Sequence, residues 1–162
     1  MKTLIWLVVL VAAGIYGSGY WSFREAGVNA LLDKWEADTR RGDAQAMCDQ
    51  LTPDMTFSTH ATVNGRSIDR EGDRSLMCAD MQKLLPALVK VVTDDNVTRD
   101  NFKVSRPGLH WWTAEVSYTE HRDRTLQNAM HLKTISEDHL MLVKTFDGVR
   151  LKRLESNERL DR

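Results

Sequence analysis

An uncharged segment at the N-terminus places the strongest constraint on this chain. Residues 3–23 contain no charged side chain, and Lys2 precedes them. As a helix this segment would span roughly 31 Å, about the thickness of the hydrocarbon core of a bilayer. Because positive charge collects on the cytoplasmic side of a membrane segment, Lys2 predicts that the rest of the chain lies outside the cytoplasm. The sequence therefore predicts a membrane or signal segment over residues 1–23 and a separate domain over residues 24–162.

Two interpretations of this first segment remain open. Aromatic residues near its ends, Trp6, Tyr20 and Trp21, favour an uncleaved signal anchor, because such side chains collect at membrane interfaces. The alternative is a cleaved signal peptide, since residues 11–13 (Val-Ala-Ala) have the small side chains of a cleavage site. The first predicts a protein in the inner membrane that faces the periplasm. The second predicts a secreted protein.

Both cysteines of the chain, Cys48 and Cys78, lie in the part expected to be exported. An even cysteine count outside the cytosol favours a disulfide, which would stabilise the domain by roughly 3.6 kcal/mol on the chain-entropy model. The alternative is a pair of buried free thiols on apolar helix faces. Neither cysteine has a histidine near it in sequence to activate it, so a catalytic thiol is not expected.

The remaining composition is that of an ordinary globular domain. With 162 residues and a net charge of −1, the chain suits one core and creates no overall field that would attract nucleic acid. Basic side chains near the C-terminus are interleaved with acidic ones, as on a solvated face. The five histidines include no pair at H-x-H or H-x-x-x-H spacing. We therefore expect no nucleic acid partner, no metal site and no other cofactor.

Hydrophobic periodicity predicts three helices in the first part of the domain. They cover residues 23–40, 44–51 and 73–92, where apolar side chains recur every three or four positions. Asp43 is placed to cap the second helix. Pro86 lies inside the third and predicts a kink or a restart there.

A period of two predicts strands elsewhere. The predicted strands cover residues 55–63, 66–68, 101–105, 110–121, 128–146 and 149–153. Asn64-Gly65 joins the first two, because this pair favours a type I′ turn. Residues 93–100 read as a polar loop. Residues 128–146 read as one long strand, or as two with a break near residues 136–138, and the tail from residue 157 is polar.

This order of elements resembles the nuclear transport factor 2-like superfamily, which includes SnoaL-like and ketosteroid isomerase-like proteins. The opening ALLDKWEADTRRGDAQAMCDQLTPDMTF and the closing hairpin LMLVKTFDGVRLKRLES carry the resemblance. It implies an α+β fold in which a strongly curved antiparallel sheet packs around a long helix and forms a cone with a pocket. Members include isomerases, dehydratases, small-ligand binders and assembly components, so the resemblance does not select a function.

The pocket of such a cone is expected to involve Asp54, Phe57, His60, Trp112 and Tyr118. On the strand faces predicted to point inward, Tyr118 is the one titratable side chain, and alone it would keep its proton near neutral pH. His60 falls on the polar side of its strand, and Asp54 follows a proline in an expected loop. Trp112 and Tyr118 are interpreted as core side chains, with the tyrosine hydroxyl at the rim. No catalytic residue is therefore expected.

The sequence thus favours a membrane-tethered, extracytoplasmic binding or assembly module without catalysis. The alternatives are a small isomerase- or dehydratase-like enzyme and a carrier of a small apolar ligand, each using the cone pocket. The expected partners are the membrane, through residues 3–23, and a second protein or a second copy of the chain, through the sheet. A small apolar ligand is the third.

Overall fold

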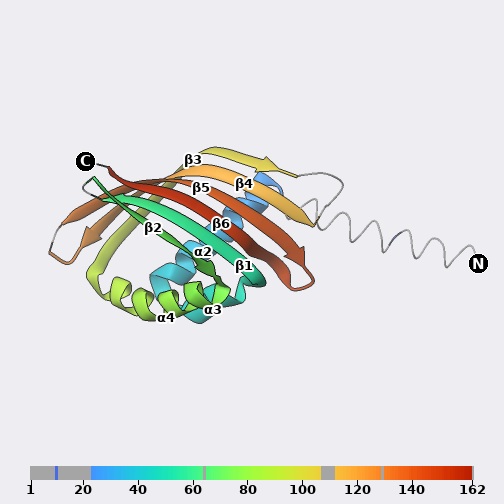
Figure 1. The fold of residues 1–162 in the computed structure, drawn as a ribbon, viewed down its shortest axis with the longest axis horizontal. Helices are drawn as coiled ribbons and strands as arrows, with labels where there is room; N and C mark the ends of the chain where they lie inside the picture. The colour runs from blue at the N-terminus through green and yellow to red at the C-terminus, as the bar shows by residue number, and fades with distance from the viewer. Residues whose placement is uncertain (1–9, 11–22, 64, 107–111, 129, 162) are drawn as a thin grey trace, which may run out of the picture.

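The computed structural model describes residues 10, 23–63, 65–106, 112–128 and 130–161. The predicted membrane or signal segment, residues 1–23, lies almost entirely outside these ranges. Within them, no helix is both long enough and apolar enough to cross a membrane. The described part of the domain forms a curved six-stranded sheet, with helices α2, α3 and α4 on its concave side (Figure 1).

Helices α2 (Glu25–Arg41) and α3 (Ala44–Asp49) lie close to their predicted positions. Gly42 ends α2 with a φ of 70°, a left-handed conformation that glycine adopts without steric cost. Asp43 then caps α3, because its side chain accepts a hydrogen bond from the Ala46 N–H. The predicted break between the two helices is confirmed.

Strands β1 (Leu51–Val63) and β2 (Arg66–Asp73) form the predicted hairpin. Their register pairs Val63 with Arg66 across the turn. Both strands are longer than the alternating pattern suggested, and Asp54, expected in a loop, lies within β1. The hairpin supplies one edge of the sheet, since β2 pairs with β1 alone.

Helix α4 (Arg74–Val91) matches the third predicted helix. The Asp73 side chain caps it by accepting a hydrogen bond from the Leu76 N–H. The helix runs on through Pro86, so the restart considered from the sequence does not occur. One side chain of α4, Leu85, is buried, which leaves most of its apolar face only partly covered.

Three of the last four strands are longer than predicted, and the remaining one is shorter than its predicted range, residues 128–146. The four strands are β3 (Val92–Ser105), β4 (Thr113–Leu126), β5 (His131–Thr145) and β6 (Gly148–Asp161). Residues 93–100, expected as a loop, belong to β3 and pair with β4. Strand β5 is continuous through residues 136–138, which is the first of the two alternatives drawn from the sequence, and β6 extends through the polar tail. The errors in β3 and β6 share one cause: the inner face of the sheet is polar here, so the apolar half of the alternation is missing.

The strand order is β2-β1-β6-β5-β4-β3. Strands β1 and β6 run parallel, and the other neighbours are antiparallel. The sheet is therefore mixed rather than wholly antiparallel as predicted. Its core lies between the sheet and α2, with these buried members: Phe23, Val28, Leu32, Leu51, Met55, Phe57, Ala114, Val116, Tyr118, Leu140, Leu142 and Leu151. Helix α2, rather than α4, makes most of the helical contribution to this core.

Candidate functional site

The inner face of β4 changes from apolar to charged along its length. Ala114, Val116 and Tyr118 are buried, and Glu120, Arg122 and Arg124 follow them at the same two-residue period. Because alternate residues of a strand share one face, all six point toward the concave side. Tyr118 lies at the junction between the apolar core and the charged half.

Asp138 of β5 lies directly opposite Tyr118 in the strand register. Both residues are 8% exposed, and the two side chains are close enough for each to shift the pKa of the other. Two hydroxyls donate to the Asp138 carboxyl group: Ser156 Oγ to Oδ1 at 2.6 Å and Ser136 Oγ to Oδ2 at 3.2 Å. The Phe102 ring stacks on Tyr118 with centroids 5.8 Å apart. The pair is thus held in a fixed orientation from three strands.

Burial changes the acidity of both members of this pair. It raises the pKa of Asp138 above its ordinary value; the Ser156 hydroxyl opposes this shift and the negative charge of Glu120 adds to it. Burial also raises the pKa of Tyr118 well above its ordinary value, and the Asp138 charge adds to that. Tyr118 therefore stays protonated, while Asp138 holds a proton more strongly than an exposed aspartate would. A proton donor and a proton acceptor lie side by side.

A cavity of about 310 Å³ lies in front of this pair. We call it the polar chamber; its wall includes Arg99, Tyr118, Glu120, Arg122, Arg124 and Asp138. On the helix side it is bounded by Trp35 and Glu36 of α2. The chamber is therefore enclosed between the inner face of the sheet and α2.

Ion pairs connect the two sides of the polar chamber. The Arg99 guanidinium lies 2.9 Å from Asp33 and 3.2 Å from both Glu36 and Glu120. It therefore ties β3 to α2 and to β4. Burial works against the charge of Arg99, but its contacts with Asp33 and Glu120 outweigh burial, so the pKa of Arg99 is raised.

The other two arginines of the polar chamber are also paired. Arg122 lies 2.9 Å from Glu120 and 3.2 Å from Asp95, and Arg124 Nε lies 3.4 Å from Asp95. Burial lowers the pKa of Arg124, and repulsion from Arg122 lowers it further. Every guanidinium in the chamber wall therefore has a carboxylate partner already.

A second, larger cavity adjoins the polar chamber. It has a volume of about 770 Å³ and lies between α4 and the sheet. We call it the apolar cleft; its wall includes Phe57, Met77, Met81, Leu84, Leu151 and Leu154. Four wall residues are common to the cleft and the chamber: Trp35, Met47, Thr59 and Leu154. An apolar space thus borders a polar one, as in many sites for small molecules.

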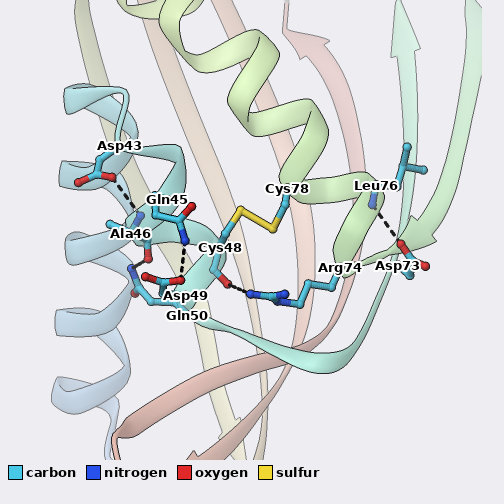
Figure 2. Close-up of a disulfide and its surroundings, with 10 residues drawn as sticks. All are labelled: Asp43, Gln45, Ala46, Cys48, Asp49, Gln50, Asp73, Arg74, Leu76 and Cys78. Carbon is cyan, nitrogen blue, oxygen red and sulfur yellow. Dashed lines mark hydrogen bonds between the residues drawn. A yellow bond between two sulfur atoms is a disulfide. The ribbon is translucent and has the colours of Figure 1, made fainter.

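A disulfide joins Cys48 and Cys78 beside the apolar cleft, and Figure 2 shows it between α3 and α4. It joins α3 to α4, with Cα atoms 5.6 Å apart, and Arg74 donates a hydrogen bond to the Cys48 carbonyl beside it. The predicted pairing is confirmed. Because Met47 and Met77 next to the two cysteines line the cleft, the disulfide restrains its width.

The structure separates the predicted pocket residues into two groups. Phe57 lines the apolar cleft and Tyr118 the polar chamber. His60 instead faces solvent and contacts Asp69 across the hairpin. Trp112 is 42% exposed and is absent from the walls of both cavities, so its predicted place beside Tyr118 is wrong. It precedes the start of β4, where the alternation that the prediction used does not yet hold.

Asp54 is the remaining predicted pocket residue, and it also lies outside both cavities. Its side chain is exposed, and its carboxylate lies 3.1 Å from the Lys152 ammonium. Hydrogen bonds from Thr52 and then Lys152 lower its pKa. Asp54 is therefore an ionised surface group, which is unsuited to exchange protons with a molecule in the cone.

The sequence reasoning missed Asp138, because it left open whether the strand breaks near residues 136–138 and assigned these residues to neither face. The alternation of β5 contained the signal: Leu142 and Leu140 are buried, and Asp138 follows them at the same period. The expectation that Tyr118 is the one titratable side chain on the inner face is therefore wrong. In the described ranges, no group of three or more His, Cys, Asp or Glu side chains could hold a metal ion.

Comparison with solved structures supports the fold. The beta subunit of a proposed aromatic-ring-hydroxylating dioxygenase from Novosphingobium aromaticivorans matches with a TM-score of 0.63 and 12% identity, over 85% of this chain and 90% of that chain. A proposed dehydratase of the NTF2-like family from Streptomyces avermitilis matches at 0.58 and 15%, over 80% and 91%. An NTF2-like protein from Novosphingobium aromaticivorans matches at 0.53 and 16%, over 83% and 89%.

Comparison with family models and with curated proteins finds no match. The structural likeness nevertheless confirms the resemblance drawn from the sequence: the domain has the nuclear transport factor 2-like fold. At these identities the likeness defines the fold, and function must be argued from the cavities themselves.

Proposed function

We propose that the domain binds a small molecule inside the cone. The observation that carries this proposal is the apolar cleft of about 770 Å³ beside a polar chamber that contains the buried Asp138–Tyr118 pair. The cleft takes an apolar body, because burying apolar surface is favourable and nearly independent of orientation. The chamber takes a polar group, whose hydrogen bonds fix the orientation of the ligand.

Acid–base chemistry on the bound molecule is the second candidate function. It is favoured by the Asp138–Tyr118 pair, because burial raises the pKa of Asp138 toward the range in which a carboxylate accepts and returns a proton. In this account Asp138 is the proton acceptor and Tyr118 positions it. The proposed dehydratases among the proteins of similar fold agree with this chemistry, although their activity is a property of those proteins.

The proposed setting is extracytoplasmic. The uncharged residues 3–23 and the Cys48–Cys78 disulfide support it, and the same residues would tether the domain to the membrane. A protein partner or a second copy at the sheet stays a prediction. The assembly role without a ligand gains no support from the described structure, because a filled cone would suit it better than two adjoining cavities.

The test is binding of a neutral aromatic probe, 2-naphthalenemethanol, to the full chain, measured by saturation-transfer NMR and intrinsic fluorescence. We expect saturable binding, and we expect Met81→Arg to weaken it at least tenfold by placing a charge in the apolar cleft. Met141→Arg is the matched control, because Met141 lies on the outer face of β5, beside the buried Leu140 and Leu142. Absence of saturable binding, or equal loss in both variants, would contradict the proposal.

A further inference from the structure

The charges of the polar chamber are not balanced. Arg99, Arg122 and Arg124 each have a carboxylate within ion-pair distance. Among the carboxylates of the wall, Glu36 and Glu120 contact arginines. Asp138 and Glu158 also line the chamber, and among the described residues no cation lies within ion-pair distance of either. The charge of Glu158 nevertheless acts on Arg124 and raises the pKa of that guanidinium. Asp138 is therefore the wall carboxylate with no cationic partner, and Glu158 has a cation nearby but none in contact.

Asp138 is the more unusual of the two. It is more than nine-tenths buried, and its hydrogen-bond partners are the hydroxyls of Ser136 and Ser156 rather than a cation. Buried carboxylates in proteins are normally paired with a positive charge or a metal ion. Glu120 and Glu158, facing it from β4 and β6, are like charges, and Arg99 contacts Glu120 instead.

The strand register brings Asp138 and Glu158 close together. Asp138 pairs with Ser156, and Glu158 pairs with Ser136, so the two carboxylates are diagonal neighbours on the inner faces of β5 and β6. Such neighbours have backbone positions roughly 7–8 Å apart. A single charged group between them is within reach of both side chains.

The inner face of β6 leads from the apolar cleft to this position. Leu154 lines both cavities, Ser156 is the hydroxyl partner of Asp138, and Glu158 follows at the same two-residue period. At a strand rise of about 3.3 Å per residue, Glu158 lies roughly 13 Å along the strand from Leu154. A molecule with an apolar body of one or two rings and a short charged arm spans this distance.

We propose that the ligand is an amphipathic cation: an apolar molecule that carries a protonated amine, with its ammonium between Asp138 and Glu158. This inference rests on the proposed function of the cone as a small-molecule site. An ammonium supplies the cationic partner that Asp138 lacks, and its three N–H groups can donate hydrogen bonds to carboxylate and hydroxyl oxygens. An apolar carboxylic acid is disfavoured, because each of the three arginines already has a carboxylate within ion-pair distance and Asp138 has no cation beside it.

Three probes of the same shape test the charge selectivity: 2-naphthylmethylamine, 2-naphthalenemethanol and 2-naphthoate, each bound to the full chain at pH 7. We expect the amine to bind roughly tenfold or more tightly than the alcohol, the range of a hydrogen bond to a charged group, and the acid to bind most weakly. Equal affinity for all three overturns this inference and leaves the proposed function intact. Failure of all three to bind overturns both.

Variants locate the ammonium. We expect Glu158→Gln to reduce the preference for the amine over the alcohol severalfold, with the alcohol affinity retained. We expect Asp138→Asn to weaken binding of the amine severalfold more than binding of the alcohol. Glu155→Gln is the matched control, because Glu155 lies on the outer face of the same strand. Glu158 is only partly buried, so its variant tests the proposal even if Asp138→Asn fails to fold. An unchanged amine preference in Glu158→Gln contradicts the proposed position.

Discussion

Removal of the Ser156 hydroxyl tests the assignment of Asp138 as a buried carboxylate held by hydroxyl donors. Ser156 Oγ lies 2.6 Å from Asp138 Oδ1, whereas Ser136 Oγ lies 3.2 Å from Oδ2. A hydrogen bond to a charged group contributes about 1.5–3 kcal/mol and one to a neutral group about 0.5–1.5 kcal/mol. At pH 8 we therefore expect Ser156→Ala to lower the free energy of unfolding by about 2 kcal/mol, and Ser136→Ala to lower it by less.

The pH dependence gives the sharper test. The pKa of Asp138 is already raised in the folded protein, and the loss of a hydroxyl that stabilises the charged form raises it further. The folded state of Ser156→Ala thus binds a proton up to a higher pH than the native protein does. The destabilisation by Ser156→Ala should be largest above this raised pKa and shrink as the pH falls toward 3.8, the ordinary value.

Urea unfolding followed by circular dichroism from pH 3.5 to pH 8 measures this difference. Ser117→Ala on the outer face of β4 controls for the loss of a serine from the sheet. A loss that is the same at every pH would show that the hydroxyl does not act through the charge of Asp138. A larger loss in Ser136→Ala than in Ser156→Ala would contradict the geometry.

Three further outcomes follow from the packing. The double variant Cys48→Ala/Cys78→Ala should lower the free energy of unfolding by about 3–4 kcal/mol. Its hydrogen exchange should increase more in α4 than in β4 and β5, because only one side chain of α4 is buried. Equal increases in all three elements would contradict the role of the disulfide in restraining the cleft. Leu142→Ala should cost about 2–5 kcal/mol in thermal or urea unfolding, since Leu142 is fully buried; a cost under 1 kcal/mol contradicts the assigned core. Gly42→Ala should lower the free energy of unfolding more than Gly65→Ala does. Both glycines have a positive φ, which strains any alanine, but only at Gly42 would the added Cβ also meet another side chain, that of Val89 at 3.3 Å.

The fold was predictable where local chemistry agrees with the final structure. The left-handed end of α2 at Gly42, the cap at Asp43 and the turn after Val63 are short-range signals, and each was read correctly. The strand predictions failed where the inner face of the sheet becomes polar. In residues 93–100, charged side chains such as Asp95 and Arg99 form ion pairs inside the cone. From the sequence alone, such a polar stretch cannot be told from a loop.

The site was less predictable than the fold, because its geometry depends on long-range register. Tyr118 was identified from its strand face, but its partner Asp138 comes from another strand and meets it through a pairing that the sequence does not state. With a break near residues 136–138 left open as an alternative, Asp138 was assigned to neither face of the strand. The prediction placed Trp112 on the inner face by extending the alternation of β4 to the residue that precedes its first residue, Thr113; the side chain is in fact exposed.

The most direct test of the central claim is a crystal structure of the full chain soaked with 2-naphthylmethylamine. We predict that the rings lie in the apolar cleft against Met81 and Leu154, with the amine nitrogen within hydrogen-bond distance of the Asp138 carboxylate. Rings bound elsewhere, or a cleft closed by the protein's own side chains, would contradict the account of the cone as a ligand site.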